Sequence, residues 1–384
     1  MKNYFSTGFK IGILGGGQLG KMLIQAASAW DIDIYVLDPT DDCPASKLAT
    51  KFVKGDFKDY ESVYNFGKLV DLITIEIEHV NTDALLRLKE EGKTICPDPQ
   101  TLKIIQDKGK QKDFFKDNNL ISASYKIYQD HEAILSDIEK RKLNLPFVQK
   151  VCRFGYDGRG VQLVNSKKDL DNLLEGQSIV EDLVDIGKEL SVIVCRNKFG
   201  EIKTYDPFEM EFHKNANLVE YLISPARIEK NSRQIAIDLA EKTIKAFELV
   251  GVLAVEMFLD KDHNILINEV APRPHNSGHH TIETALTSQY EQHIRAIMGL
   301  PLGSTDLIIN SVMVNILGED GFSGNVVYEG LDKCIKLDGV KVHIYGKKQT
   351  KPFRKMGHVT IIDKNIDNAL KKADIVKHTL RSVS

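Results

Sequence analysis

The spacing of apolar and polar residues changes several times along the chain. In the first 100 residues this pattern predicts a parallel α/β domain. An apolar run at residues 10–14 leads into a glycine-rich turn, a helical stretch extends to about Trp30, and a second apolar run covers residues 34–39. A strand, a helix and a strand in this order form a βαβ unit. A further buried-strand pattern covers residues 71–78. We therefore expect a small doubly wound domain that ends at residues 96–99, where two prolines so close together forbid regular helix.

The middle of the chain mixes short strands with helices and closes on a hairpin. The pattern predicts a polar helix at residues 107–118 and a long helix at about 231–249. Two short runs, 255–258 and 267–270, alternate apolar and polar positions around a polar turn, which predicts a β-hairpin. After Pro301 the pattern is mostly β up to about Ile362, and a basic helix follows. Three further strands are expected at residues 145–150, 178–181 and 189–194.

Composition describes an ordinary water-soluble enzyme or binding protein. A chain of 384 residues is too long for one compact core, so two or three domains are expected. Apolar residues make up 42% and charged residues 27% of the chain. The net charge of −3 gives no field that would attract nucleic acid or an acidic membrane. No apolar run suits a signal peptide or a membrane span, so we expect a cytoplasmic protein.

The cysteines and the C-terminal charges refine this description. The five cysteines are scattered and include no C-x-x-C pair, which favours reduced thiols over disulfides or structural zinc. From Lys341 onward the chain has eleven Lys and Arg against three Asp, an excess of 11 − 3 = 8 positive charges. Such an excess fits a nucleic-acid patch, and it fits a site for an anionic small molecule equally well.

Acidic and amide side chains end the two strands of the predicted hairpin. Glu256 lies in the first strand, and Asn268 and Glu269 lie in the second. A hairpin brings their oxygens close together, and carboxylate and amide oxygens suit Mg²⁺ that also holds substrate phosphates. The alternative is a solvated hairpin whose acids face only water.

Two glycine clusters indicate binding of anions. Gly15, Gly17 and Gly20 match G-x-G-x-x-G, and Asp38 ends the next strand, as in dinucleotide-binding proteins. A strand-to-helix glycine turn also binds other anions, and nothing downstream resembles a hydride-transfer site. The second cluster, residues 155–160, follows Lys150 and joins two strands. It suits a flap whose backbone N–H groups fold over phosphates, or an ordinary hairpin turn.

The order of these features resembles the ATP-grasp superfamily, in which ATP lies between a small lid and a larger body. Four motifs sharpen the likeness to the family of N5-carboxyaminoimidazole ribonucleotide synthetases, and the resemblance runs from about Ile11 to about Ile362. The motifs are residues 15–22, 155–160, 268–279 and 354–358.

The resemblance implies a fold of mixed α/β and α+β class with three domains. Residues 1–98 would form a doubly wound domain that precedes the ATP-grasp domain. Residues 99–301 would form the ATP-grasp domain, with a mobile lid at about 120–184. Residues 302–384 would form a small β-rich domain that completes the substrate site.

The resemblance also implies roles for individual residues. Glu256 and Glu269 would bind Mg²⁺, and Lys150, Asp157 and Arg273 would take part in catalysis. The nucleotide would contact Lys108, Lys150, Gly155, Tyr156, Asp157, Gly158, Arg159, Gly160, Val161, Glu181, Asp182, Leu183, Val184, Glu189, His213, Asn268 and Glu269. The ribonucleotide substrate would contact Gln18, Leu19, Glu76, Tyr156, Asp157, Arg273, Asn276 and Ser277, and its phosphate would contact Lys347, Arg354 and Lys355.

The family reaction is carboxylation of the exocyclic amine of 5-aminoimidazole ribonucleotide, with ATP, bicarbonate and a carboxyphosphate intermediate, in purine synthesis. The resemblance implies one or two Mg²⁺ ions, for which Mn²⁺ can substitute. It also implies a homodimer whose product passes to a mutase, with no nucleic-acid or membrane partner. Asp157 would act as a base on the amine or would support the flap. Two positions depart from the family pattern: Lys108, where Arg is commoner, and Asp182, where a basic or neutral residue is commoner.

Three other functions compete with this interpretation. An oxidoreductase would use the first glycine cluster and Asp38, and a non-catalytic module would bind ATP without turnover. A formate-using transformylase of glycinamide ribonucleotide would share the ATP-grasp fold and the pair of metal-binding glutamates. The histidines at 275, 279 and 280 are not expected to bind zinc, because their neighbours are oxygen ligands.

Overall fold

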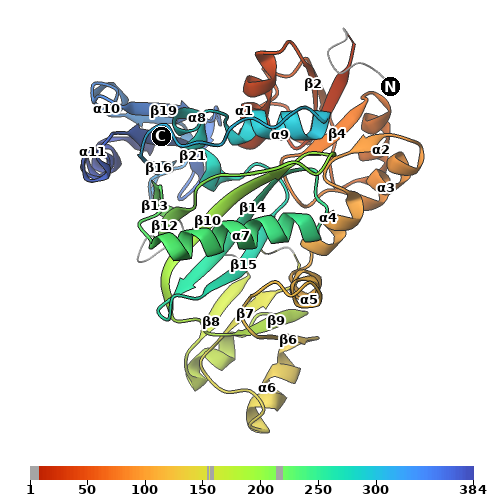
Figure 1. Ribbon diagram of the computed structural model, residues 1–384, viewed down its shortest axis with the longest axis vertical. Helices are drawn as coiled ribbons and strands as arrows, with labels where there is room; N and C mark the ends of the chain where they lie inside the picture. Colours follow the sequence, from red (N-terminus) through yellow and green to blue (C-terminus); the bar gives the residue numbers. More distant parts are fainter. Residues whose placement is uncertain (1–7, 154, 156–159, 213–218) are drawn as a thin grey trace.

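The computed structural model describes residues 8–153, 155, 160–212 and 219–384. The N-terminal residues form an α/β domain, which Figure 1 shows in red to orange beside a long central sheet. A small antiparallel sheet, drawn in yellow, forms a separate lobe at the far end. The blue C-terminal elements, some of whose strands extend the central sheet, lie on the other side (Figure 1). The predicted combination of α/β and α+β structure is confirmed.

The N-terminal domain is a doubly wound parallel sheet, as predicted. Its strands run in the order β3-β2-β1-β4-β5, so the order reverses between β1 and β4. Ligands of such sheets bind at the carboxyl ends of the strands where the order reverses. The strands are β1 (Lys10–Leu14), β2 (Asp33–Asp38), β3 (Lys51–Lys54), β4 (Leu72–Ile75) and β5 (Thr94–Ile95), and the helices are α1 (Gln18–Ser28), α2 (Tyr60–Lys68) and α3 (Thr82–Glu90).

Two local predictions about this domain need correction. The strand expected at residues 71–78 ends at Ile75, so Glu76 and Glu78 follow the carboxyl end of β4 instead of lying within it. The prolines at residues 97 and 99 do not exclude helix, because α4 (Pro99–Ile105) begins at the second of them. Proline is tolerated at the first helical position, where its missing N–H would have no partner in the helix.

The central sheet has the order β15-β14-β10-β12-β13-β16-β21-β19, and β11 pairs with β10 at its side. Because β13 pairs with β16, the sheet continues without interruption into the C-terminal residues. The strands are β10 (Ile186–Arg196), β11 (Ile202–Thr204), β12 (Phe208–Phe212), β13 (Val219–Ser224), β14 (Gly251–Asp260), β15 (Ile265–Ala271), β16 (Ser311–Leu317), β19 (Val340–Ile344) and β21 (Lys355–Ile362).

Helices cover both faces of this sheet. Helix α7 (Lys230–Ala246) packs its apolar side on β10, β14 and β15, in the front of Figure 1. Helix α9 (Gln289–Met298) packs on the opposite face and against α1, which joins the N-terminal domain to the body. The remaining C-terminal elements are α8 (Thr281–Thr284), β17 (Gly324–Asn325), β18 (Val327–Glu329), α10 (Leu331–Cys334), β20 (Gln349–Thr350), α11 (Ile366–Thr379) and β22 (Arg381–Val383).

The yellow lobe is a four-stranded sheet in the order β6-β9-β7-β8, which we call the lid sheet. Its own small core separates it from the body. Helix α5 (Lys108–Asp117) connects the two, and in Figure 1 it lies where the yellow lobe meets the rest of the molecule. The elements of the lobe are β6 (Tyr125–Tyr128), α6 (His131–Glu139), β7 (Phe147–Val151), β8 (Val161–Val164) and β9 (Ser178–Asp182).

All five cysteines are buried free thiols, as the scattered spacing predicts. Among the residues that the structure describes, no helix combines the length and the apolar character needed to cross a membrane.

Candidate active site

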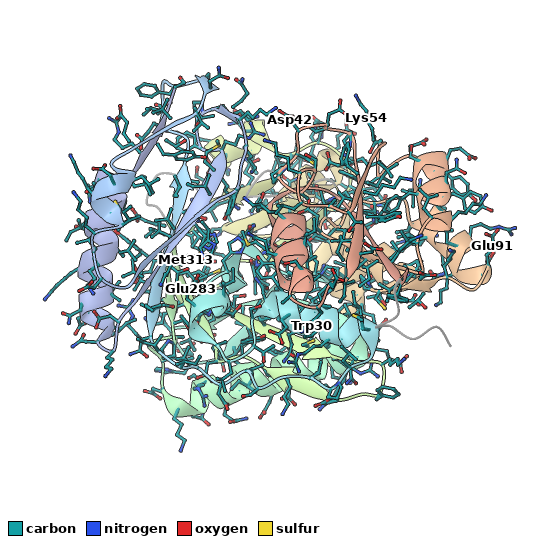
Figure 2. The ribbon with its side chains drawn as sticks, turned by 90° about the horizontal axis from the view of Figure 1, so that it is seen from above. Trp30, Asp42, Lys54, Glu91, Glu283 and Met313 are labelled. Carbon is teal, nitrogen blue, oxygen red and sulfur yellow. The ribbon has the colours of Figure 1, made fainter. Side chains whose placement is uncertain are left out.

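A cavity of about 790 Å³ lies where the lid sheet, the central sheet and the N-terminal domain meet. Its walls come from β7 and β9 of the lid, from β10, β14 and β15 of the body, from α5, and from the segment after β4. Seen from above, the N-terminal domain and the blue C-terminal strands lie on either side, and Met313, which lines the cavity from β16, is labelled between them (Figure 2). The cavity is therefore formed by every part of the chain.

A β-bulge places the three oxygen ligands of the hairpin on one side. Glu256 of β14 lies directly opposite Glu269 of β15, and the register then shifts so that Met257 faces Ile267. Asn268 is the extra residue in the bulge. In a regular strand Asn268 and Glu269 would point to opposite faces, but a bulge allows consecutive side chains to share one face. All three residues line the cavity, as predicted.

The two carboxylates have opposite electrostatic surroundings. Burial and the nearby charge of Glu269 raise the pKa of Glu256 to about 8. Lys108, which forms an ion pair with Glu269, outweighs the effect of burial and lowers the pKa of Glu269 to about 2. Burial and Glu269 thus oppose the charged form of Glu256, and a bound cation would favour that form. Two carboxylates and one amide oxygen suit a hard divalent cation that takes its remaining ligands from phosphate, so these residues fit Mg²⁺.

Lys150 of β7 connects the lid to the hairpin. Its Nζ lies 2.7 Å from Oδ1 of Asn268 and 2.6 Å from Oε2 of Glu181 on the neighbouring strand β9. The side chain of Lys150 is only 10% exposed. An ammonium group beside the metal ligands, at the mouth of the flap strands, is well placed to attract phosphate oxygens.

The segment after β9 forms the wall of the cavity that the resemblance assigns to adenine. Asp182, Leu183 and Val184 all line it, and Glu189 lines it from β10. Burial raises the pKa of Glu189 to about 7, with Lys150 acting in the opposite direction. Hydroxyl groups of a bound ribose would donate to this carboxylate and favour its ionised form.

A second group of polar residues approaches from the N-terminal domain. Arg273 forms an ion pair with Glu78, at 2.5 Å between Nη2 and Oε1, and donates from Nη1 to the carbonyl of Pro274. Gln18 donates to Asn276 at 3.3 Å. Leu19, Glu76, Ser277 and Lys355 line the same part of the cavity, which brings most of the predicted substrate residues together.

The first glycine cluster holds a carboxylate of the protein itself. The N–H groups of Gly17 and Gly20 donate to Oε1 and Oε2 of Glu76 at 2.8 and 2.9 Å, and Gly16 donates to Asp38 at 2.8 Å. A Cβ on Gly17 would lie 2.7 Å from Glu76 Oε1, so glycine is needed for this approach. The anion site at the start of α1 is thus filled by Glu76, which counts against a dinucleotide pyrophosphate there.

We expect Glu76→Gln to lower the apparent Tm by roughly 2–8 °C, measured by differential scanning fluorimetry. The amide would turn an NH₂ group toward one glycine N–H and leave that buried donor unsatisfied, at about 1–3 kcal/mol. The matched control is Glu61→Gln on the exposed side of α2, where we expect a shift below about 1 °C. Equal Tm values for the two variants would contradict this role of Glu76.

Several predicted residues are not brought to the cavity or lie outside the described residues. Lys347 and Arg354 do not line the cavity; they donate to the carbonyls of Lys355 and Gln349, both at 2.7 Å. Gly155 and Val161 line the cavity at the two ends of the flap, and Gly160 is described but does not. Five predicted residues lie outside the described residues: Tyr156, Asp157, Gly158, Arg159 and His213.

Histidines 279 and 280 support the site without forming a metal cluster. His279 lies 2.5 Å from Oη of Tyr290 and 3.1 Å from Oδ1 of Asn276, and His280 bonds to the carbonyl of Ser277. Within residues 8–153, 155, 160–212 and 219–384, no three His, Cys, Asp or Glu side chains are grouped as a metal site.

The charged residues that the sequence analysis missed include Glu78 and Lys112. Glu78, the partner of Arg273, was assigned to a strand, and Lys112, the partner of Glu181, was part of a polar helix. The spacing of Lys108 and Lys112, four residues apart on one helix, was the one available signal that both point the same way.

Three family models match successive parts of the chain. Residues 9–106 match the ribonucleotide synthetase preATP-grasp domain, residues 113–290 match the ATP-grasp domain, and residues 311–372 match the phosphoribosylaminoimidazole carboxylase C-terminal domain. The chain is 40% identical over 365 residues to the N5-carboxyaminoimidazole ribonucleotide synthase of Bacillus subtilis, covering 94% of this chain and 93% of that protein.

Solved structures of similar proteins share the whole fold. The crystal structure of N5-carboxyaminoimidazole ribonucleotide synthetase from Thermotoga maritima has a TM-score of 0.91 and 45% identity, covering 98% of this chain and 99% of the other. The synthase from Aspergillus clavatus, solved with ADP and 5-aminoimidazole ribonucleotide, has a TM-score of 0.87 and 32% identity, covering 96% and 98%.

Proposed function

Because the chain belongs to the family of N5-carboxyaminoimidazole ribonucleotide synthases, which are ATP-grasp ligases, we propose how its own residues carry out the family reaction. The enzyme carboxylates 5-aminoimidazole ribonucleotide with ATP in purine biosynthesis. The observation that carries the proposal is the bulged hairpin: Glu256, Asn268 and Glu269 line one cavity with Lys150, next to substrate residues of the N-terminal domain.

The nucleotide would lie between the lid sheet and the central sheet. Asp182 to Val184 would contact the adenine, Glu189 would accept from the ribose hydroxyls, and Lys150 and Lys108 would approach the phosphates. Lys108 now pairs with Glu269, so it would exchange a carboxylate for a phosphate when ATP binds. Glu256 and Glu269 would hold one or two Mg²⁺ ions, or Mn²⁺ in their place, which neutralise phosphate charge during transfer.

The chemistry needs charge neutralisation and alignment more than covalent help from the protein. Bicarbonate would attack the γ-phosphoryl group of ATP to give carboxyphosphate and ADP. The carboxyl group would then pass to the exocyclic amine of the ribonucleotide, with release of phosphate. Lys150 and Arg273 would stabilise the charge that develops on the transferred group. The walls of the cavity would limit hydrolysis of the mixed anhydride by water.

The ribonucleotide would bind on the N-terminal side of the cavity. Gln18, Asn276 and Ser277 would hydrogen-bond to it, and Arg273 would lie at the junction between the two substrates. Lys355 is the basic C-terminal residue that lines the cavity, and it would contact the substrate phosphate together with Lys347 and Arg354. We further propose that the enzyme works as a cytoplasmic homodimer and that its product passes to a mutase.

A coupled assay of ADP formation tests this function directly. We expect turnover only when ATP, Mg²⁺, bicarbonate and 5-aminoimidazole ribonucleotide are all present, with at least a 100-fold loss when the ribonucleotide is omitted. Glycinamide ribonucleotide with formate serves as the control for the related transformylase reaction. Turnover with that pair, or ATP binding with no turnover under any condition, would contradict the proposal.

The oxidoreductase alternative has its own test. NAD should not raise the Tm, because Glu76 fills the start of α1, whereas Mg²⁺ with ATP should raise it by mass action. Stabilisation by NAD alone would favour the alternative.

A further inference from the structure

Three charged residues form a buried row beside the nucleotide region. Glu181 of β9 lies between Lys150 of β7 and Lys112 of α5: its Oε2 is 2.6 Å from Nζ of Lys150, and its Oε1 is 2.5 Å from Nζ of Lys112. The side chains of Lys112, Glu181 and Lys150 are 3%, 5% and 10% exposed. Water therefore screens these charges very little.

Burial opposes the charges of Glu181 and Lys112. Burial opposes ionisation of Glu181, yet Lys150 and Lys112 outweigh it and hold the pKa of Glu181 below its usual value. Burial lowers the pKa of Lys112, and Glu181 partly offsets the shift. Neither Nζ of Lys112 nor Oε1 of Glu181 has a well-aligned hydrogen bond among the described residues. Lys112 therefore interacts with Glu181 mainly through its charge and not through a directed hydrogen bond.

The row has two positive groups and one negative group, a sum of 2 − 1 = +1. Without Lys112, Glu181 and Lys150 would form a neutral pair, and the field of Lys150 toward the cavity would be largely cancelled. Without Glu181, Lys150 would lose the carboxylate that orients it toward Asn268. Glu181 is thus required to orient Lys150, and Lys112 is required to offset the charge of Glu181, so that Lys150 can still attract an anion.

We propose that Lys112 is a positioning residue for nucleotide binding: it neutralises Glu181, so that Glu181 orients Lys150 while Lys150 keeps its positive charge for the phosphates. This inference rests on the proposed binding of ATP phosphates by Lys150. Lys112 does not line the cavity, so it acts through Glu181 and not by contact with the nucleotide.

The placement of α5 makes this role effective. Lys108 and Lys112 are four residues apart, so they share one face of α5. Lys108 pairs with Glu269 on the body, and Lys112 pairs with Glu181 on the lid sheet. In Figure 1, α5 lies at the junction of these two parts. One helix therefore supplies the lysine of two ion pairs, one on the body and one on the lid sheet.

The test is the dissociation constant of ATP with Mg²⁺, measured by isothermal titration calorimetry on the full chain. We expect Lys112→Met to weaken ATP binding about tenfold or more, because Glu181 would then cancel the charge that Lys150 presents to the phosphates. Lys112→Arg keeps the charge and should stay within about threefold of the wild type. The double variant Lys112→Met with Glu181→Gln again leaves a net charge of +1 on Lys150 but removes the carboxylate that orients it. It should therefore recover part of the loss and bind ATP within about threefold of the wild type.

A merely structural role of Lys112 would give a different pattern. Adenosine lacks phosphates, so its affinity, measured by displacement of a fluorescent nucleotide, should change less than twofold in Lys112→Met. Lys372→Met is the matched control: it removes another partly buried ion pair, with Asp363 at 2.8 Å, on α11 away from the cavity. We expect this control to lower Tm without changing ATP affinity.

The inference is overturned if Lys112→Met binds ATP within twofold of the wild type, or if the double variant binds no better than Lys112→Met. If Lys112→Met does not fold, the double variant decides alone: affinity within threefold of the wild type supports the inference, and a tenfold loss overturns it. If the wild-type protein does not bind ATP, the proposed function itself fails, so the two failures are distinguishable.

Discussion

Glu269→Gln should reduce kcat/KM for ATP-dependent carboxylation by on the order of 10³-fold, because it removes one of the two carboxylates that face the phosphates. Gln keeps the size of the side chain but has no charge to bind Mg²⁺. The variant should also need a much higher Mg²⁺ concentration for half-maximal rate. Steady-state rates measured across a Mg²⁺ titration give both quantities.

The hairpin itself offers the matched control. Asp262 lies in the exposed turn between β14 and β15, so Asp262→Asn removes an acid from the same hairpin without touching the cavity. We expect this control to retain activity within about twofold. Full turnover of Glu269→Gln at ordinary Mg²⁺ would show that the metal assignment is wrong.

Arg273→Met should reduce kcat/KM for the ribonucleotide by about 10²- to 10³-fold and leave the affinity for ATP within about threefold. Its guanidinium pairs with Glu78, and its buried Nε has no hydrogen-bond partner among the described residues, so it retains capacity for a substrate oxygen. Arg273→Lys should recover little of the loss, since lysine lacks the planar fork that bonds two groups at once.

Arg295→Met is the control for this experiment. Arg295 also pairs with a glutamate, Glu291 at 2.7 Å, but it lies on α9 outside the cavity. We expect its kinetic constants to be near those of the wild type. If Arg273→Met changes ATP affinity and leaves the KM of the ribonucleotide unaltered, Arg273 belongs to the nucleotide side of the site.

The patterned elements could be predicted because their signals are local. The residues of β1, α1, α7 and the hairpin follow clear periods, and the structure confirms them within a few residues. The bulge at Asn268 could not be predicted, because an extra residue in one strand is defined only by the register of the other. The prediction that Glu256, Asn268 and Glu269 share a face was therefore right, but the reason is the bulge and not the alternation of apolar and polar residues.

Contacts between distant segments had no local signal. Glu76 fills the turn after β1 although it lies 59 residues after Gly17, and the G-x-G-x-x-G spacing alone fits a bound anion equally well. The pair Arg273–Glu78 joins two domains, and the pair Lys112–Glu181 joins α5 to the lid sheet. Family resemblance, by contrast, supplied most of the cavity residues, because it carries information about three-dimensional positions that periodicity lacks.

The continuity of the central sheet bears on how this polypeptide could be shortened. β13 pairs with β12 on one side and with β16 on the other. A protein ending near Pro301 would therefore leave unpaired those main-chain groups of β13 that face β16. An exposed edge strand of this kind can pair with strands of other molecules, which leads to self-association. The final eighty residues thus cover an edge of the central sheet. If a fragment that lacks them is insoluble, that result alone does not show whether they take part in the reaction.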